Sequence, residues 1–411
     1  MIPSRPSRRG LQSILSFVGV GLFVLAGCGS SDDSQTREGE PRSPAASAPG
    51  NVDWLMFGRV PARTHALPLQ RDLDPPLKQE WSFNDRVLVE FPPALHNGVA
   101  YLADKYGNVR ALQTSDHKVL WDIQKSKENV GPPSDVTGPA WHRGKVVVAF
   151  HGGELAALDD KTGEIAWKRN LKSRLESSPA VGNGRVYIGT DKGDVDAFDV
   201  GTGRPVWTRS LGDAPVKASP SLAGHAVCAA NYVGRVFCLD DRTGKILWSR
   251  QTAGLDGTGG FYASPAIVGR RLIDARDDGT VFGFDLDTGR VEWSFGTGGP
   301  VYGSPAVTVS KWSPITVFVG SYDHHLYAID GRNGKKLWSY DVGGEVPGTP
   351  TVVGRTVYTS SFTTEESIGI DITTRKKVFH FPSPGYTPMV SDGRNLYLAG
   401  YFTLHKFVPQ R

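Results

Sequence analysis

Few residues of this chain have the type and spacing that chemistry requires. His324 and His325 are adjacent, and on a strand their side chains point to opposite faces, so they cannot bind one metal ion together. The run from Asp274 to Asp285 approaches the spacing of a calcium-binding loop, but Arg276 stands at a ligand position and such a loop needs flanking helices. The sequence also lacks a Gly-x-Ser-x-Gly nucleophile turn and a phosphate-binding P-loop. We therefore predict no metal site and no catalytic residue of these classes.

Cys28 ends a segment with the features of an export signal. Residues 1–10 contain three Arg and no acid, and residues 11–25 are mostly apolar but too short for a membrane span of about 20 residues. The next residues, Leu25-Ala26-Gly27-Cys28, resemble the lipobox of bacterial lipoproteins, whose cysteine is diacylated. The sequence predicts a lipoprotein signal peptide over residues 1–27 and lipidation of Cys28. The alternative is an ordinary signal peptide or an uncleaved anchor.

The composition after this segment is that of an exported protein that does not bind nucleic acid. Residues 28–50 hold the cysteine and then no large apolar residue, which predicts a disordered tether. The net charge is +4, and three of the positive charges lie in the first ten residues. The nearly neutral remainder argues against a phosphate-backbone partner. We predict anchoring at the cell envelope, on the outer membrane of a two-membrane host and otherwise on the outer face of the cytoplasmic membrane.

The rest of the chain, residues 51–411, repeats one pattern of eleven residues that ends in an aromatic residue. The copies are ALQTSDHKVLW (111–121), ALDDKTGEIAW (157–167), AFDVGTGRPVW (197–207), CLDDRTGKILW (238–248), GFDLDTGRVEW (283–293), AIDGRNGKKLW (328–338) and GIDITTRKKVF (369–379). Their aromatic ends lie 40–46 residues apart. A period of this length is typical of a propeller or another repeat array.

Each period predicts four short antiparallel strands. In the third copy we expect strands over residues 178–181, 185–189, 194–199 and 205–211, because apolar alternation is bounded there by Gly, Asn and Asp turns. The Trp residues provide the large faces that pack between neighbouring sheets. The predicted blade-docking residues are Trp81, Trp121, Trp167, Trp207, Trp248, Trp293 and Trp338.

The two ends of the repeat region predict the number of blades. Residues 390–407 provide three strands and no outer strand with a Trp, whereas residues 77–83 contain Trp81 without the strands that should precede it. Joining them makes an eighth blade and removes the open sheet edges. We therefore predict an all-β, eight-bladed propeller of four-stranded antiparallel blades, with the last blade closed by both termini. Seven blades are the alternative.

The pattern Ala-x-Asp-x-x-Thr-Gly-x-x-x-Trp resembles the tryptophan-docking repeat of the pyrroloquinoline-quinone (PQQ)-like β-propeller superfamily. Trp54-Leu55-Met56-Phe57-Gly58 also resembles the usual opening of that superfamily. A lipoprotein with a single propeller is most similar to the BamB family of outer-membrane assembly lipoproteins. The resemblance implies a membrane-anchored, non-catalytic scaffold, monomeric on its own, that binds envelope proteins and assists outer-membrane protein assembly.

The same superfamily includes PQQ- and Ca²⁺-dependent dehydrogenases. The resemblance implies that these enzymes hold the quinone against two adjacent cysteines and a Trp, and Ca²⁺ with Glu, Asn and Asp. Here Cys228 and Cys238 are ten residues apart and the loops are short. We therefore predict that the chain is not an enzyme and binds no cofactor. The alternatives are a quinoprotein dehydrogenase, or a binder of a small ligand or glycan over the central channel.

Three further predictions concern single residues. The Asp of each copy begins a turn and is expected to bind the turn backbone rather than to do chemistry. Cys228 and Cys238 fall on adjacent strands of one hairpin, where a disulfide and two buried thiols are both possible. One face of the propeller collects the turns of the second hairpins and the long returns, and loops carry function more often than strands. The predicted binding residues on it are Tyr232, Asp277, Tyr322, Asp323 and His324.

Overall fold

The computed structural model describes residues 52–68, 73–84, 88–124, 135–252, 259–309, 315–383, 385 and 389–410. All of them lie in one compact unit, Ala46–Arg411. The predicted signal peptide over 1–27, the tether over 28–50 and Cys28 lie outside the described residues. No helix in the described part of the chain is long and apolar enough to cross a membrane.

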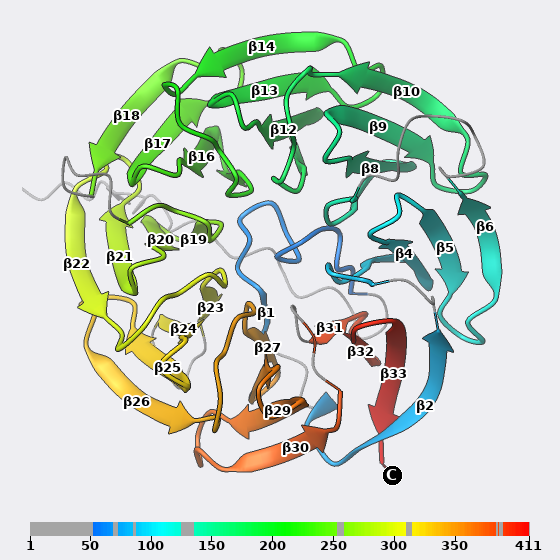
Figure 1. The fold of residues 1–411 in the computed structure, drawn as a ribbon, viewed down its shortest axis with the longest axis vertical. Helices are drawn as coiled ribbons and strands as arrows, with labels where there is room; N and C mark the ends of the chain where they lie inside the picture. The colour runs from blue at the N-terminus through cyan, green and yellow to red at the C-terminus, as the bar shows by residue number, and fades with distance from the viewer. Residues whose placement is uncertain are drawn as a thin grey trace, which may run out of the picture. The chain divides into compact units, whose positions relative to one another are not determined.

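The described residues form eight antiparallel sheets arranged as a ring of blades (Figure 1). The innermost strands are β3 (Ala94–His96), β7 (Ala140–His142), β11 (Ala180–Gly182), β15 (Ser221–Ala223), β19 (Ala266–Val268), β23 (Ala306–Thr308), β27 (Thr351–Val353) and β31 (Met389–Ser391). The second strands are β4 (Val99–Ala103), β8 (Lys145–Ala149), β12 (Arg185–Gly189), β16 (Ala226–Ala230), β20 (Arg271–Ala275), β24 (Thr316–Gly320), β28 (Thr356–Ser361) and β32 (Leu396–Ala399).

The third strands are β5 (Val109–Gln113), β9 (Glu154–Asp159), β13 (Asp194–Asp199), β17 (Arg235–Asp240), β21 (Thr280–Asp285), β25 (His325–Asp330), β29 (Glu366–Asp371) and β33 (Thr403–Pro409). The outer strands are β6 (Val119–Ile123), β10 (Ile165–Asn170), β14 (Pro205–Ser210), β18 (Ile246–Gln251), β22 (Val291–Gly296), β26 (Lys336–Asp341), β30 (Lys377–Phe381) and β2 (Leu77–Asn84). We number the blades 1 to 8, from β3–β6 to β31–β33 with β2.

Blade 8 joins the two ends of the propeller. The N-terminal strand β2 pairs antiparallel with β33, and the sheet order is β2-β33-β32-β31. The predicted all-β propeller of eight four-stranded blades closed by both termini is therefore confirmed. A fifth strand, β1 (Ala66–Leu67), adds in parallel to the inner strand β27 of blade 7 and was not predicted.

The Trp of each regular copy packs against the glycine turn of the next blade. The Trp167 indole N–H donates to the carbonyl of Val200 at 2.8 Å. A Cβ on Gly203 would lie 2.5 Å from the same indole, so only glycine fits beneath the ring. The equivalent Trp–Gly pairs are Trp121–Gly163, Trp207–Gly244, Trp248–Gly289 and Trp293–Gly334. The repeated Gly and Trp positions therefore form the contacts that join neighbouring blades. Trp81 instead packs on the ring of His117, with centroids 5.3 Å apart, and Trp338 is buried beside Phe318.

Candidate functional site

The propeller has two faces with different kinds of loop. The return face carries the turns between second and third strands and the returns from each outer strand to the next inner strand. The motif face carries the turns between first and second strands and the Asp-x-x-Thr-Gly turns between third and outer strands. Because every blade has the same strand order, all loops of one kind gather on one face.

The central channel between these faces is lined by residues 54–67, which are blue in Figure 1. Backbone carbonyls of this segment accept hydrogen bonds from inner strands of six blades. The donor–acceptor pairs are Leu95–Trp54, Trp141–Leu55, Leu222–Pro61, Ile267–Ala62, Val307–Thr64 and Val352–His65. One early segment therefore holds most of the inner strands in place. From the sequence, its first five residues were recognised only as resembling the opening of the superfamily.

Arg63 lies at the centre of this segment and is fully buried. Its guanidinium donates to the carbonyls of Pro220 at 2.7 Å and Ser178 at 2.9 Å, and also to those of Pro179 and Phe57. Burial lowers the pKa of Arg63 to about 9. Burial, together with the charge of Arg63, lowers the pKa of His65 to about 3, so this imidazole is neutral at physiological pH.

A ladder of hydroxyl groups joins the blades where the inner strands begin. The backbone N–H of Ser178 donates to Ser219 Oγ at 2.9 Å, and the backbone N–H of Ser219 donates to Ser264 Oγ at 3.0 Å. The same contact continues through Ser304 to Thr349. Each of these Ser or Thr residues is followed by Pro in the sequence, and the role of its hydroxyl was not predicted.

The residue two positions before each of these Ser residues lies in a return just before the inner strand, on the rim of the channel, which we call its mouth. In blades 3 to 6 these residues are Glu176, Lys217, Tyr262 and Tyr302. Lys217 Nζ lies 3.3 Å from a carboxylate oxygen of Glu176. Burial, followed by the charges of Glu176 and Glu90, raises the pKa of Tyr262 to about 12. The mouth therefore combines a charged half with an aromatic half.

The aromatic half forms an arc of tyrosines over blades 4 to 6. The ring centroids of Tyr262 and Tyr302 are 6.2 Å apart, and those of Tyr302 and Tyr322 are 5.1 Å apart. Tyr232 lies beside them, with Lys217 Nζ 5.1 Å from its ring centroid. We call Tyr232, Tyr262, Tyr302 and Tyr322 the tyrosine arc. Tyr262 and Tyr302 were not predicted, although their shared position before Ser-Pro was a usable signal.

The five predicted binding residues have different roles in the structure. Tyr232 and Tyr322 belong to the tyrosine arc, and His324 is exposed in the turn after β24. Asp277 accepts the backbone N–H of Gly260 at 2.8 Å, and burial raises its pKa. The carboxylate of Asp323 accepts the Tyr327 hydroxyl at 2.6 Å. The two aspartates thus hold return-face loops in position.

The charged half of the mouth lies over blades 1 to 4. Lys105 Nζ lies 3.1 Å from Glu90 and 3.6 Å from Asp135. His151 Nδ1 is 3.3 Å from the same Asp135 carboxylate, and burial lowers the pKa of this imidazole. Acids and cations alternate here at close range, so this half provides polar contacts rather than a field of one sign.

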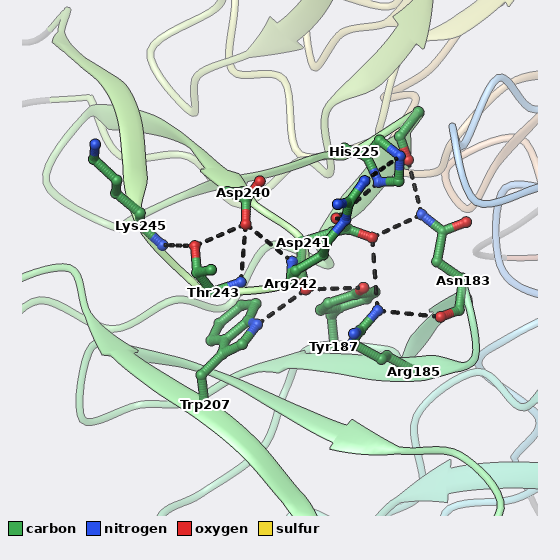
Figure 2. Close-up of polar contacts among 11 residues, drawn as sticks. Asn183, Arg185, Tyr187, Trp207, His225, Asp240, Asp241, Arg242, Thr243 and Lys245 are labelled. Atoms are coloured by element: carbon green, nitrogen blue, oxygen red, sulfur yellow. Dashed lines mark hydrogen bonds and ion pairs between the residues drawn. The ribbon is translucent and has the colours of Figure 1, made fainter.

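The motif face has a buried carboxylate, Asp241, at the joint of blades 3 and 4 (Figure 2). Its side chain is 1% exposed. It accepts Asn183 Nδ2 at 2.8 Å and lies 3.0 Å from His225 Nδ1, with Arg185 at 3.8 Å. Arg242 Nη2 lies 2.9 Å from His225 Nε2. Because a guanidinium can only donate, His225 accepts through Nε2 and donates through Nδ1 to Asp241.

The motif aspartate Asp240 next to it caps its own turn (Figure 2). Asp240 Oδ1 accepts the backbone N–H and the hydroxyl of Thr243, at 2.9 and 2.7 Å. These bonds lower the pKa of Asp240, the Thr243 hydroxyl contributing most. Thr202 and Thr288 cap Asp199 and Asp285 in the same way. The acids of the repeat are therefore occupied by backbone and hydroxyl donors.

The described residues contain a small cavity of about 200 Å³ at the seam between blades 1 and 8. It opens beside Asp53 and His96, whose side chains are 3.1 Å apart, and it is also lined by Lys406. The cavity lies on the motif face. The alternative hypothesis of a small-ligand binder concerned a different place, the central channel. Residues 54–67 lie in that channel.

The residues present do not fit the quinone site of the dehydrogenases. Cys228 and Cys238 lie opposite each other on β16 and β17, with Cα atoms 4.1 Å apart, and are joined as a disulfide. Both are buried inside blade 4. Among the described residues, no group of three or more His, Cys, Asp or Glu side chains is placed to hold a metal ion.

Comparisons with known proteins give two kinds of relative. The family model described as outer membrane protein assembly factor BamB matches residues 71–295 and 191–403. The crystal structure of BamB from Moraxella catarrhalis has a TM-score of 0.66 at 20% identity, covering 82% of this chain and 98% of that one. BamB of Nitrosomonas eutropha is 29% identical over 165 residues, which are 39% of this chain and 32% of that protein.

The other relatives are enzymes. The dehydrogenase subunit of the quinone alcohol dehydrogenase of Komagataeibacter europaeus is 28% identical over 176 residues, which are 40% of this chain and 24% of that protein. The chain thus spans about a quarter of that relative. This match contradicts our prediction that the chain is not an enzyme, which rested on the short loops and the missing cysteine pair. The family model covers most of the propeller, and the chain belongs to the family of the outer membrane protein assembly factor BamB.

Proposed function

We propose that this chain is an envelope propeller that binds protein partners through its return face and assists the assembly of outer-membrane proteins. The family match carries the proposal, because its two overlapping segments, 71–295 and 191–403, span nearly all the blades. The proposed anchor is the lipidated Cys28. In a host with two membranes the protein would lie on the outer membrane, and otherwise on the outer face of the cytoplasmic membrane.

The tyrosine arc is the part of the return face best suited to a protein partner. Tyr232, Tyr262 and Tyr302 are 37, 42 and 37% exposed. Tyrosines give a large contact area with few rotatable bonds, and they are enriched among the residues that dominate binding energy. The charged half of the mouth provides a polar rim beside them.

The arc also rests on a rigid support. Tyr262 and Tyr302 stand two residues before Ser264 and Ser304, whose hydroxyls belong to the ladder between the blades. The ladder is held in turn by the buried segment around Arg63. A preorganised surface loses less conformational entropy when it binds.

Crosslinking in the host envelope tests the proposal. The tagged full chain is crosslinked in living cells, purified from membranes and analysed by quantitative mass spectrometry. We expect enrichment of outer-membrane β-barrel proteins or of their assembly machinery. The double variant Tyr262→Ala and Tyr302→Ala should lower this enrichment about tenfold, because two central aromatic contacts are lost.

The matched control is Tyr106→Ala. Tyr106 is 55% exposed on the return face of blade 1, outside the tyrosine arc, and its loss should leave the enrichment unchanged. The proposal is overturned if an unrelated envelope lipoprotein captures the same proteins equally well, or if the Tyr106 variant loses as much capture as the double variant. Labelling with a radioactive fatty acid, with Cys28→Ala as the negative control, tests the anchor separately.

Quinone-dependent alcohol oxidation is the second candidate, favoured by the 28% identity to the dehydrogenase subunit. Titration of the purified chain with PQQ and Ca²⁺, followed by Trp fluorescence and by dye reduction with alcohols, tests it. Saturable quenching with turnover would establish this activity. A flat titration without turnover would remove it.

A further inference from the structure

The turns on the motif face of blades 4 to 7 carry exposed positive charges. Every fully described motif-face turn from the β17–β18 turn to the β29–β30 turn contributes at least one exposed Arg or Lys, whereas the β15–β16 turn of blade 4 (Gly224 and His225) has none. The exposed cations are Arg242, Lys245, Arg270, Arg290, Arg332, Lys335, Arg355, Arg375 and Lys376. They come from both kinds of motif-face turn, so the charge covers half of the ring.

Acids pair with five of these cations, and four have no ion pair among the described residues. The paired cations are Arg242, Arg270, Arg290, Arg332 and Arg355; the other four are Lys245, Lys335, Arg375 and Lys376. Asp241 is buried, and Asp330 is buried beneath its own turn, where Arg332 and Asn333 contact it. The carboxylate of Asp371 likewise accepts the backbone N–H groups of the turn that follows it. Among the described residues of these turns, Asp287 is the exposed acid, and it pairs with Arg270 at 2.5 Å. The positive charge available to a ligand on these turns therefore lies on the four cations without such a pair.

The return face of the same blades has the opposite sign. Its described turns carry Asp277, Asp278, Asp323, Glu345 and Glu365. Arg276, the Arg of these turns, is largely buried and pairs with Asp278. A chain with a net charge of only +4 therefore separates its charges between two faces.

The chain also enters the propeller on the motif face. The backbone N–H of Val52 donates to the carbonyl of Asp392, in the turn between β31 and β32, at 3.1 Å. Asp53 contacts His96 next to the turn between β3 and β4. Val52, the first described residue, therefore lies on this face.

We propose that the motif face of blades 4 to 7 binds an anionic lipid surface. This rests on the proposed function in one respect: an anchor at Cys28, separated from Val52 by residues 29–51, would hold the propeller near the membrane, because a flexible coil of that length has a root-mean-square span of about 25 Å. Exposed Lys and Arg interact with anionic headgroups within a Debye length of about 10 Å. Binding through the motif face turns the tyrosine arc away from the lipid, toward protein partners.

Vesicle binding by the unacylated chain tests this inference. All eight blades and their closure lie within residues 52–410, so residues 29–411 keep the complete propeller and lack the signal peptide and Cys28. Cosedimentation is measured with phosphatidylcholine vesicles that contain about 30% phosphatidylglycerol, and with pure phosphatidylcholine vesicles. We expect binding to the anionic vesicles only, weakened at least about tenfold between about 50 and about 500 mM NaCl.

Two variants with equal charge changes locate the surface. The motif-face variant is Arg332→Glu, Lys335→Glu, Arg375→Glu and Lys376→Glu, and it should bind about a hundredfold more weakly. The control is Lys168→Glu, Lys172→Glu, Lys192→Glu and Arg235→Glu, at exposed positions outside the motif-face turns, and it should keep at least half of the binding.

Three results would overturn the inference. These are no binding to the anionic vesicles, an equal loss in both variants, and binding to heparin without binding to vesicles, which would point to a soluble polyanion. The test needs neither an acyl chain nor a partner protein. Its failure is therefore distinguishable from a failure of partner capture through Tyr262 and Tyr302.

Discussion

The two faces of the propeller use the same residue types for opposite purposes. On the motif face Asp240 and Asp241 are used internally, by a turn and by a blade joint, and the Arg and Lys beside them are exposed. On the return face Lys217 and Arg276 pair with Glu176 and Asp278, and the tyrosine rings are exposed. The acids and Trp residues of the motif face therefore stabilise the fold. The loops of the return face differ from blade to blade and rest on the hydroxyl ladder. This difference predicts where substitutions cost stability and where they cost binding.

The largest expected effect is the loss of a docking Trp. Trp207→Ala removes the ring over Gly244 and the hydrogen bond to the carbonyl of Asp241. We expect a loss of about 3–5 kcal/mol in the free energy of unfolding, measured by urea denaturation. Tyr262→Ala on the return face should cost less than about 1 kcal/mol. Equal losses would break the comparison between the faces.

The next effect concerns the glycine beneath that Trp. Gly244 has a φ of +66°, and a Cβ there would lie 2.7 Å from the Trp207 ring. Gly244→Ala should destabilise the fold by about 2–3 kcal/mol, from backbone strain plus the displaced ring. Gly224, with a φ of +57° and no atom within 4 Å of a Cβ, is the control. Gly224→Ala should cost only the strain, about 1 kcal/mol, and thermal denaturation of both variants isolates the docking contact.

A smaller effect is expected at the hydroxyl ladder below the tyrosine arc. Ser219→Ala leaves the buried N–H of Ser178 without its acceptor. The expected loss is about 1–2 kcal/mol by urea denaturation. Ser249→Ala, on the exposed outer strand β18, should change the stability by less than about 0.5 kcal/mol. A similar value for both variants would mean that the ladder does not stabilise the return face.

The smallest effects are expected at two carboxyl groups whose pKa values are shifted in opposite directions. The Thr243 hydroxyl lowers the pKa of Asp240 on the motif face, so its contribution to stability is present above the unfolded pKa and is lost as the pH falls. Burial raises the pKa of Asp277 on the return face, so its contribution is present at low pH and is lost as the pH rises through the folded pKa. Carboxylate ¹³C titration should give a lower pKa for Asp240 than for Asp277. Thr243→Val should raise the pKa of Asp240 and leave that of Asp277 unchanged.

The blades could be predicted from the sequence because their signals are local. The expected strands at 185–189 and 194–199 coincide with β12 and β13, since apolar alternation and turn residues act over a few positions. The channel segment could not be predicted in this way. Arg63 contacts residues more than 100 positions away, and no periodic pattern marks a segment that gives single carbonyls to successive blades.

Only the part of the candidate site that lies in local turns could be predicted from the sequence. Turn positions such as Tyr232 and Tyr322 follow directly from the strand pattern. Tyr262 and Tyr302 lie in returns between blades, and their meeting depends on the blade-to-blade ladder rather than on their own neighbours. The charge difference between the faces was also missed, because a net charge averages over both faces.

Because β2 pairs with β33, the ring of blades can close only after the last strand has been synthesised. Ser82 and His405 make contact across 323 positions of the chain, and residues 54–67 bind inner strands formed much later in synthesis. During synthesis the first segment therefore emerges long before its partners. Contacts between such distant residues slow folding and leave strand edges exposed meanwhile. A propeller of this topology is most vulnerable to proteases in the interval before its last strand emerges, when its blades exist but its ring is still open.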